Sequence, residues 1–324
     1  MKRHLIRTKM MILVGVVLLV FAGGAAGLTL RAYAFQTVTI GYTASIDGHL
    51  DGCSCWGAPV GGVVKLAAGL RGDAADARPD ILVDTGNALP PGSEPALSRY
   101  ILDTYEQLEY DVVAIGDQET SDGVEALISY LETYPVATHN VRVQGGPDPL
   151  SVPIERTIND VVVGVISITG REALAAYPAE VRSLFEIGGV DTTLRRILSE
   201  HGDWYDLLIV VYHGTYEKAK QIGRTFPSIT AIVFGREELH VEERLNNGVT
   251  LVSPGRDGTY LGSLSIVTRR KRRTGAVTVT RIAIGRRYFD YNNDPDDPEV
   301  REYIDAYEAM REELLQARVE KTKF

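Results

Sequence analysis

Five short apolar runs in this chain each end in a polar turn, and this repetition constrains the fold more than any other feature. The runs are separated by segments in which apolar residues recur at helical spacing, as in residues 94–108. Such alternation predicts an α/β protein in which chemistry gathers at the carboxyl ends of the strands. In chain order the turns read TASIDG (43–48), DTGN (84–87), GDQE (116–119), VYHGT (211–215) and FGREE (234–238).

The same periodicity predicts where most elements lie. One helix is expected to begin at a Ser121 cap and to end at Thr133, and the basic residues Arg269 to Arg273 fit a solvated hairpin turn. Three late runs of alternating polarity, 249–252, 260–267 and 277–284, predict antiparallel strands. The other expected strands are 37–41, 80–87, 111–119, 161–168, 206–213 and 229–238, and the other expected helices are 61–72, 94–108, 189–201, 217–225 and 300–320.

The N-terminal segment has the features of a targeting signal. A basic stretch is followed by the uncharged apolar residues 10–22, and a small-residue region ends in Ala32-Tyr33-Ala34. Residues 1–34 are therefore expected to be a signal peptide, although the uncharged run from Met10 to Leu30 is also long enough for a retained membrane anchor. Either alternative predicts an exported protein, periplasmic or held on the outer face of the cytoplasmic membrane, that meets the membrane only through this segment.

The charge of the remaining chain argues against nucleic-acid binding. Residues 1–34 contain five basic residues and no acidic ones, so the rest of the chain carries 29 basic and 43 acidic residues, a net charge of −14. Such a surface repels a phosphate backbone. The hydrophobic share of 44% is typical of a soluble globular domain with a sizeable core.

The order of the five turns resembles that of the calcineurin-like metallophosphatases, in particular the catalytic domain of bacterial 5′-nucleotidases. In that family the turns read TND-x-HG, GD, GNHE, SH-x-G and GH-x-H or GH-x-Q, and a Gly-x-x-Leu-Gly strand follows, similar to Gly258–Gly262 here. The resemblance covers residues 38–284. It implies an αββα sandwich of two mixed β-sheets flanked by helices in a domain of residues 35–285, followed by an acidic linker and a C-terminal helix in residues 286–324.

The same resemblance implies that the family's two-metal site is altered in this chain. The family's bridging aspartate corresponds to Asn87, its transition-state acid to Gln118, and one histidine ligand to Arg236. An amide cannot bridge two cations as a carboxylate does, and it cannot protonate a leaving group. The other positions that correspond to family site residues are Ser45, Asp47, Asp117, His213 and Glu238, of which only His213 keeps the family's residue type.

Two arrangements of these residues remain open. Asp47, Asp117, His213 and Glu238 could hold one divalent cation, such as Mn²⁺, Zn²⁺, Fe²⁺ or Mg²⁺. Alternatively, the guanidinium of Arg236, which repels cations, could pair with Asp117 or Asp47 and replace the metal by an ion pair.

The first polar turn is followed by both cysteines of the chain, Cys53 and Cys55. A disulfide across one intervening residue is strained and easily reduced, so the pair is expected to be redox-active or, with His49 nearby, metal-binding. The loop also resembles that of an exported branch of 5′-nucleotidase-like proteins with a Cys-Gly-Cys motif followed by Gly-Gly. His139 and Asn140 correspond to an Ala-Asn pair of the family and are expected to line the site.

These observations favour an exported metallophosphoesterase-fold protein with a degenerate site, a pseudoenzyme that acts as a binding or redox-linked accessory through Cys53 and Cys55. The alternative is an active phosphoester or nucleotide hydrolase with a reduced metal set. The expected partners are a small phosphorylated or nucleotide ligand and an exported redox protein.

Overall fold

The computed structural model describes residues 33–52, 61–72, 78–256, 258–271, 274–290 and 292–321. The expected signal segment up to residue 32 and the Cys53/Cys55 pair lie outside the described residues. The chain divides into a small unit, formed by the described part of Met1–Thr37 with Ile266–Ile282, and a large unit, formed by Val38–Ser265 with Ala283–Phe324. The residues of the candidate functional site all lie in the large unit.

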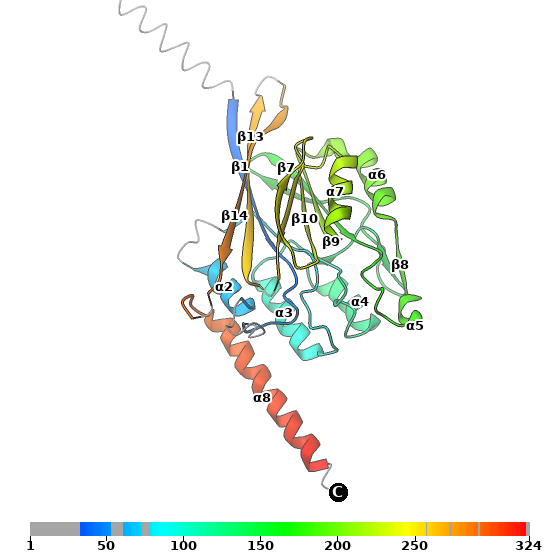
Figure 1. The fold of residues 1–324 in the computed structure, drawn as a ribbon, viewed down its shortest axis with the longest axis vertical. Helices are drawn as coiled ribbons and strands as arrows, with labels where there is room; N and C mark the ends of the chain where they lie inside the picture. The colour runs from blue at the N-terminus through cyan, green and yellow to red at the C-terminus, as the bar shows by residue number, and fades with distance from the viewer. Residues whose placement is uncertain are drawn as a thin grey trace, which may run out of the picture. The chain divides into compact units, whose positions relative to one another are not determined.

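Strands and helices alternate through most of the large unit (Figure 1). The helices are α2 (Val63–Arg71), α3 (Pro95–Gln107), α4 (Val124–Thr133), α5 (Ala179–Arg182), α6 (Val190–His201), α7 (Tyr216–Thr225) and α8 (Pro298–Lys321), with a 3₁₀ turn at Gly202–Trp204. The strands are β1 (Tyr33–Thr43), β2 (Ile81–Asp84), β3 (Val112–Ala114), β4 (Val136–Ala137), β5 (Val141–Val143), β6 (Ile154–Ile158), β7 (Val161–Thr169), β8 (Phe185–Ile187), β9 (Leu207–Gly214), β10 (Ala231–Arg236), β11 (His240–Arg244), β12 (Thr250–Pro254), β13 (Tyr260–Lys271) and β14 (Val277–Tyr288).

The strands form two six-stranded sheets and a two-stranded ribbon. The first sheet has the order β14-β13-β1-β2-β3-β4, and the second has the order β11-β12-β10-β9-β7-β6. Strands β1 to β4 are parallel, as are β7, β9, β10 and β12, whereas β6 and β11 join the second sheet antiparallel. Strands β5 and β8 pair separately. The prediction of two mixed sheets is confirmed.

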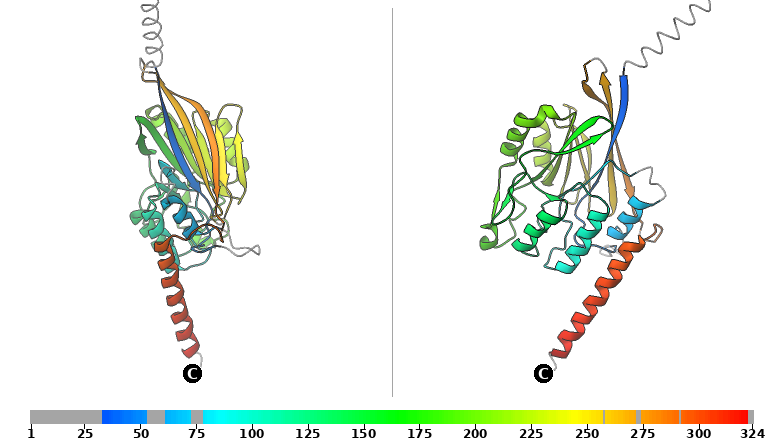
Figure 2. Two further views of the ribbon diagram at one scale, coloured as in Figure 1. Left: turned by 90° about the vertical axis from the view of Figure 1, so that its left-hand side faces the viewer. Right: turned by 180° about the vertical axis from the view of Figure 1, so that it is seen from behind.

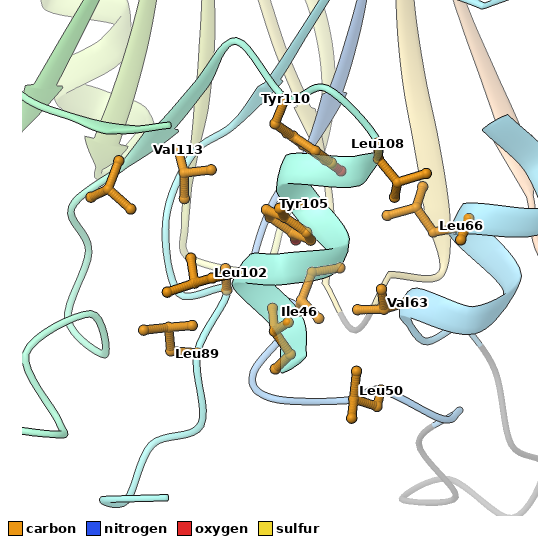
Figure 3. Close-up of a cluster of buried hydrophobic side chains, with 14 of the residues drawn as sticks. Ile46, Leu50, Val63, Leu66, Leu89, Leu102, Tyr105, Leu108, Tyr110 and Val113 are labelled. Atoms are coloured by element: carbon orange, nitrogen blue, oxygen red, sulfur yellow. The ribbon is translucent and has the colours of Figure 1, made fainter. Parts of the chain in front are cut away.

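Helices cover the outer face of each sheet. Helices α2, α3 and α4 lie side by side over the first sheet, and their apolar residues pack against Leu82 of β2 and Val113 of β3 (Figures 2 and 3). Within this cluster the rings of Tyr105 and Tyr110 stack with centroids 4.1 Å apart. Helices α6 and α7 cover the second sheet through a separate cluster that includes Leu194 and Ile222.

The inner faces of the two sheets are also apolar. Ile81 and Val83 of β2 and Ile209 and Val211 of β9 are fully buried, yet they alternate with the residues that contact the helices. Because successive side chains of a strand point to opposite faces, these residues face the space between the sheets. His213 of β9 has the same parity as Val211, so the strand directs it toward the first sheet.

Three details differ from the sequence-based prediction. Helix α4 begins after Gly123 and has no side-chain cap, and the hydroxyl of Ser121 donates instead to the carbonyl of Pro90. Strand β12 pairs antiparallel with β11, as expected, but it is fully buried and also pairs parallel with β10, which the sequence did not predict. Strand β13 continues to Lys271, so the first half of the basic run is strand and not turn.

In the part of the chain that the structure describes, no helix combines the length and the apolar character needed to cross a membrane.

Candidate functional site

The candidate site lies where the carboxyl ends of the two sheets meet. His213, at the end of β9, is fully buried, and its Nδ1 lies 2.8 Å from the carbonyl oxygen of Thr85, in the turn after β2. In register, His213 pairs with Gly235 of β10 and Thr169 of β7. One histidine side chain thus links the central strand of the second sheet to the first sheet.

Two glycines make this close approach possible. A Cβ on Gly86 would lie 2.9 Å from His213 Nδ1, and a Cβ on Gly116 would lie 2.6 Å from His213 Cε1. Gly86 also has a φ of 93°, which a side chain disfavours. The glycines in the turns DTGN and GDQE are therefore required by the packing of the histidine between the sheets.

Asp117, in the turn after β3, forms the centre of a charged cluster. Its Oδ2 lies 2.8 Å from His213 Nε2 and 2.9 Å from Arg236 Nε, and its Oδ1 lies 3.3 Å from Arg236 Nη2. Burial opposes ionisation of this carboxyl group, but the hydrogen bonds and positive charges of His213 and Arg236 outweigh it and hold the pKa of Asp117 below its ordinary value. Arg236 and Asp117 therefore form a bidentate ion pair, and His213 contacts the same carboxylate.

Both ring nitrogens of His213 face oxygen acceptors, the carbonyl of Thr85 and the carboxylate of Asp117. Both nitrogens are therefore engaged by neighbouring oxygens. A histidine that binds a metal must instead offer a free lone pair. The nitrogen available for that purpose, Nε2, is directed at Asp117.

Two amide side chains, Asn87 and Gln118, form hydrogen bonds within and between these turns. Asn87 Oδ1 accepts from the backbone N–H groups of Asp117 at 2.7 Å and of Gln118 at 3.2 Å. Gln118 Nε2 in turn donates to Asp47 Oδ1 at 2.7 Å, whereas Gln118 Oε1 is buried and has no hydrogen-bond partner among the described residues. Asp47 is thus connected to the Asp117 cluster through an amide side chain.

Glu119 is a site residue that the sequence analysis did not single out. Its buried carboxylate accepts from the backbone N–H groups of Gly116 at 2.6 Å, Ala88 at 2.8 Å and Asn87 at 3.1 Å. It therefore fixes the turn after β2 against the turn after β3. The sequence did offer a signal for this role, because Glu119 ends the GDQE turn after a buried strand. A buried carboxylate at such a place needs hydrogen-bond donors, here backbone N–H groups.

The backbone of the site is strained. Of the eight non-glycine residues with positive φ in the described chain, five lie in these turns: Ser45, Asp47, Asn87, Arg236 and Glu238. Each such conformation costs on the order of 1–3 kcal/mol and persists only where the surroundings enforce it. Ser45 is also buried, and no residue in the described part of the chain hydrogen-bonds its hydroxyl.

Two further predicted site residues, Glu238 and His49, contact other parts of the chain. Glu238 forms an ion pair of 2.5 Å with Arg256. His49 Nδ1 contacts the carbonyl of Ile46 at 2.8 Å. These contacts bring neither side chain onto Asp117 or His213.

His139 and Asn140 fasten the loop after β4 to β7. The backbone N–H of Ser167 donates to His139 Nδ1, and His139 Nε2 lies 2.9 Å from the carbonyl of Val152. Burial lowers the pKa of His139 to about 4, so the ring is neutral. Asn140 bonds the backbone of Thr169 and Gly188. The contacts of both residues are thus with the backbone of neighbouring segments.

A divalent metal fits this donor set poorly. The carboxylate of Asp117 already accepts from a guanidinium, and His213 Nε2 is directed at the same carboxylate. Among the described residues, no group of three or more histidine, cysteine, aspartate or glutamate side chains is placed to hold a metal ion.

No protein-family model and no curated protein matches the sequence. Solved structures do match in shape. The calcineurin-like phosphoesterase YfkN from Bacillus subtilis is 17% identical, with a TM-score of 0.73, over 87% of this chain and 100% of that chain. The 5′-nucleotidase precursor from Thermus thermophilus is 18% identical, with a TM-score of 0.71, over 87% of this chain and 60% of that chain.

The NAD nucleotidase of Haemophilus influenzae is 13% identical, with a TM-score of 0.67, over 87% of this chain and 68% of that chain. This chain spans about three fifths of the length of the 5′-nucleotidase precursor from Thermus thermophilus. Identities this low establish the fold alone. The protein has the calcineurin-like metallophosphatase fold that 5′-nucleotidases share, two mixed sheets flanked by helices.

Proposed function

We propose that this protein is a non-hydrolytic member of the 5′-nucleotidase-like fold, an exported binding or accessory protein. The observation that carries the proposal is the contact of Arg236 and His213 with the same carboxylate, that of Asp117. A fixed guanidinium supplies the positive charge that a cation would otherwise supply, and it does so without an exchangeable coordination position.

The hydrogen bonds of the neighbouring turns support the same proposal. A two-metal phosphoesterase stabilises both the attacking and the leaving oxygen through its cations and needs a group that protonates the leaving group. Here Asn87 accepts backbone hydrogen bonds and Gln118 donates to Asp47, so both side chains already serve the local structure. Neither side chain can act as an acid.

The accessory role would use the exported redox partner and the Cys53/Cys55 pair expected from the sequence. In the sequence, Cys53 and Cys55 lie between Asp51 and Gly61 and follow the turn that contains Asp47. The names of the structural neighbours, 5′-nucleotidase and NAD nucleotidase, support a phosphorylated or nucleotide ligand for the site. Both assignments are part of the proposal.

A hydrolase with one metal ion is the second candidate. The observation that favours it is the arrangement of Asp117 beside His213, with Asp47 connected to them through Gln118. Metal binding at this place requires that Arg236 leave the carboxylate of Asp117. The two candidates therefore differ in whether Arg236 is displaced.

The first test measures metal content and phosphatase turnover of the purified chain with added Mn²⁺, Zn²⁺ or Mg²⁺. We expect no tightly bound divalent metal and no phosphomonoesterase or phosphodiesterase activity above background, because losses at several catalytic groups together leave little rate enhancement. Arg236→His should raise metal affinity because it removes the competing charge. The matched control Arg182→His changes an exposed arginine of α5 and should leave metal affinity unchanged.

Metal-dependent turnover of a nucleotide by the unmodified protein, with loss of that turnover in His213→Ala, would favour the hydrolase. Metal affinity that rises equally in Arg236→His and Arg182→His would show that the effect is unspecific. In that case the charge-replacement argument for Arg236 is wrong.

A further inference from the structure

Charge is divided unevenly between the two units of the chain. In the sequence, Ile266–Ile282 contains six basic residues and no acidic one, and Met1–Thr37 contains five basic residues and no acidic one. The large unit holds the other 23 basic residues and all 43 acidic ones, a net charge of −20. The small unit is thus a local excess of positive charge in an acidic protein, and such an excess attracts a partner rich in anions.

In the described residues, the hairpin of β13 and β14 presents this positive charge. Arg269 and Lys271, near the end of β13, are exposed, and so is Arg281 of β14. The backbone N–H of Lys271 donates to the carbonyl of Ala276 at 2.9 Å, which closes the hairpin. The three cations therefore lie on a paired ribbon whose backbone fixes their spacing.

The start of β1 lies beside this hairpin (Figures 1 and 2). The hydroxyl of Thr268 donates to the carbonyl of Gln36 at 3.3 Å. The preceding residue, Phe35, is 64% exposed. A large apolar side chain next to a group of cations is typical of segments that bind at the surface of a membrane, where the ring enters the headgroup region and the cations meet lipid phosphates.

The sequence before β1 favours a bilayer as the source of the anions. Residues 10–30 carry no charge and form a run long enough to span a bilayer, and β1 begins at Tyr33. A retained anchor of this kind would bring the start of β1, and the hairpin beside it, to the membrane surface. A nucleic acid offers similar phosphates, but it has no apolar phase for Phe35 or for the uncharged run.

We propose that the β13–β14 hairpin and the start of β1 form a contact site for an anionic phospholipid bilayer. In this contact Arg269, Lys271 and Arg281 meet lipid phosphates, and Phe35 enters the headgroup region. The negative charge of the large unit opposes other ways of approaching the same surface. The Asp117 cluster belongs to the large unit, so the contact does not depend on the function proposed above.

The test is hydrogen–deuterium exchange of the purified full chain, mixed with vesicles of phosphatidylcholine alone or of phosphatidylcholine and phosphatidylglycerol in equal parts. We expect the backbone amides of residues 266–282 to exchange more slowly with the anionic vesicles than with the neutral ones. The edge strand β11 (His240–Arg244) should show no such difference. The slowing should disappear in salt of about 1 M, where the Debye length falls to about 3 Å.

Paired variants separate the hairpin from the N-terminal segment, which they leave unchanged. Lys271→Gln with Arg281→Gln should lose most of the slowing, since each basic residue close to an anionic surface changes the affinity about fivefold. Both positions are exposed, so this variant should fold normally. The matched control, Arg182→Gln with Arg224→Gln, removes two exposed charges of α5 and α7 and should behave as the unmodified chain does.

Three results would overturn the proposal. Equal exchange of residues 266–282 with both kinds of vesicle would show that the hairpin does not contact the lipid. Equal slowing in the unmodified chain and in the variant with Lys271→Gln and Arg281→Gln would show that these cations do not make the contact. Slowing by a DNA duplex without vesicles, together with no slowing by the anionic vesicles, would identify a nucleic acid as the partner.

Discussion

Asp84, at the end of β2, is a fully buried carboxyl group directly beneath the site. Its Oδ2 accepts from the hydroxyls of Thr43 at 2.6 Å and Tyr105 at 3.1 Å, and its Oδ1 accepts from the backbone N–H of Gly86 at 2.8 Å. Burial is the largest effect and raises the pKa of Asp84 to about 7 in spite of these bonds. The folded protein therefore favours the neutral acid.

This raised pKa makes stability depend on pH. Between about pH 4 and pH 7 the folded state binds more protons at Asp84 than the unfolded state does. The contribution of Asp84 to the free energy of unfolding is therefore complete below about pH 4 and is lost as the pH rises to about 7. Asp84→Asn cannot ionise. We expect its stability relative to the unmodified chain to rise across that window, by up to about 4 kcal/mol. Urea unfolding at a series of pH values measures this difference.

Asp80→Asn is the matched control, because Asp80 is an exposed aspartate just before the same strand. A difference from the unmodified chain that is common to both variants would reflect the loss of a carboxylate in itself and not its burial. A difference between Asp84→Asn and the unmodified chain that stays flat from pH 4 to pH 7 would contradict the assignment of a raised pKa to Asp84.

At the scale of elements, α8 is joined to the large unit mainly through its first half. Val300 and Ile304 are buried in the cluster that also contains α2 and α3, and Arg301 pairs with Asp51 and Asp296. Leu314 and Leu315, further along the helix, are 59% and 53% exposed. The contacts of α8 with the hydrophobic core therefore come from its first half.

Ile304→Ala should lower the free energy of unfolding by about 2–5 kcal/mol, because it removes buried apolar surface and leaves a cavity. Leu314→Ala, ten residues along the same helix, should change it by about 0.5 kcal/mol or less, as is usual for exposed positions. Chemical denaturation of the two variants measures the contrast. Equal effects would mean that α8 is not anchored through its buried half.

The sequence predicted most elements because apolar runs and helical spacing are local properties. It did not predict the pairing of β12, since parallel contact with β10 is decided by residues far apart in the chain. The Ser121 cap was wrong for a similar reason, because a hydroxyl near a helix start also finds distant partners, here the carbonyl of Pro90. Local patterns thus locate elements but do not fix their partners.

At the scale of the whole molecule, the site depends on how the two sheets meet. The order of the turns was enough to place Asp117, His213 and Arg236 among the candidate residues, and pairing of Arg236 with Asp117 was one of the two arrangements left open. The bond from Gln118 to Asp47 and the role of Glu119 required the structure, because both depend on the spacing between turns of neighbouring strands.

Three changes, Asn87→Asp, Gln118→His and Arg236→His, give these positions the residue types that the resemblance to metallophosphatases implies for an active site. Asn87→Asp keeps the oxygen that accepts from Asp117 and Gln118, so the turn should fold. Gln118→His loses the bond to Asp47 but regains an acid, and Arg236→His removes the charge that opposes a cation.

We expect Arg236→His alone to bind Mn²⁺ more tightly than the unmodified chain without phosphatase activity, and the triple variant to gain both metal binding and measurable turnover of a phosphomonoester. The reason is that the bridging carboxylate, the acid and the metal ligand act together in catalysis. Restoring only one of them is therefore expected to raise the reaction rate very little. Titration calorimetry and a phosphate-release assay follow the two properties separately. The double variant Asn87→Asp, Gln118→His, which retains Arg236, is the matched control and should do neither. Turnover in that control would show that the guanidinium does not block the metal, and the charge-replacement argument would then fail.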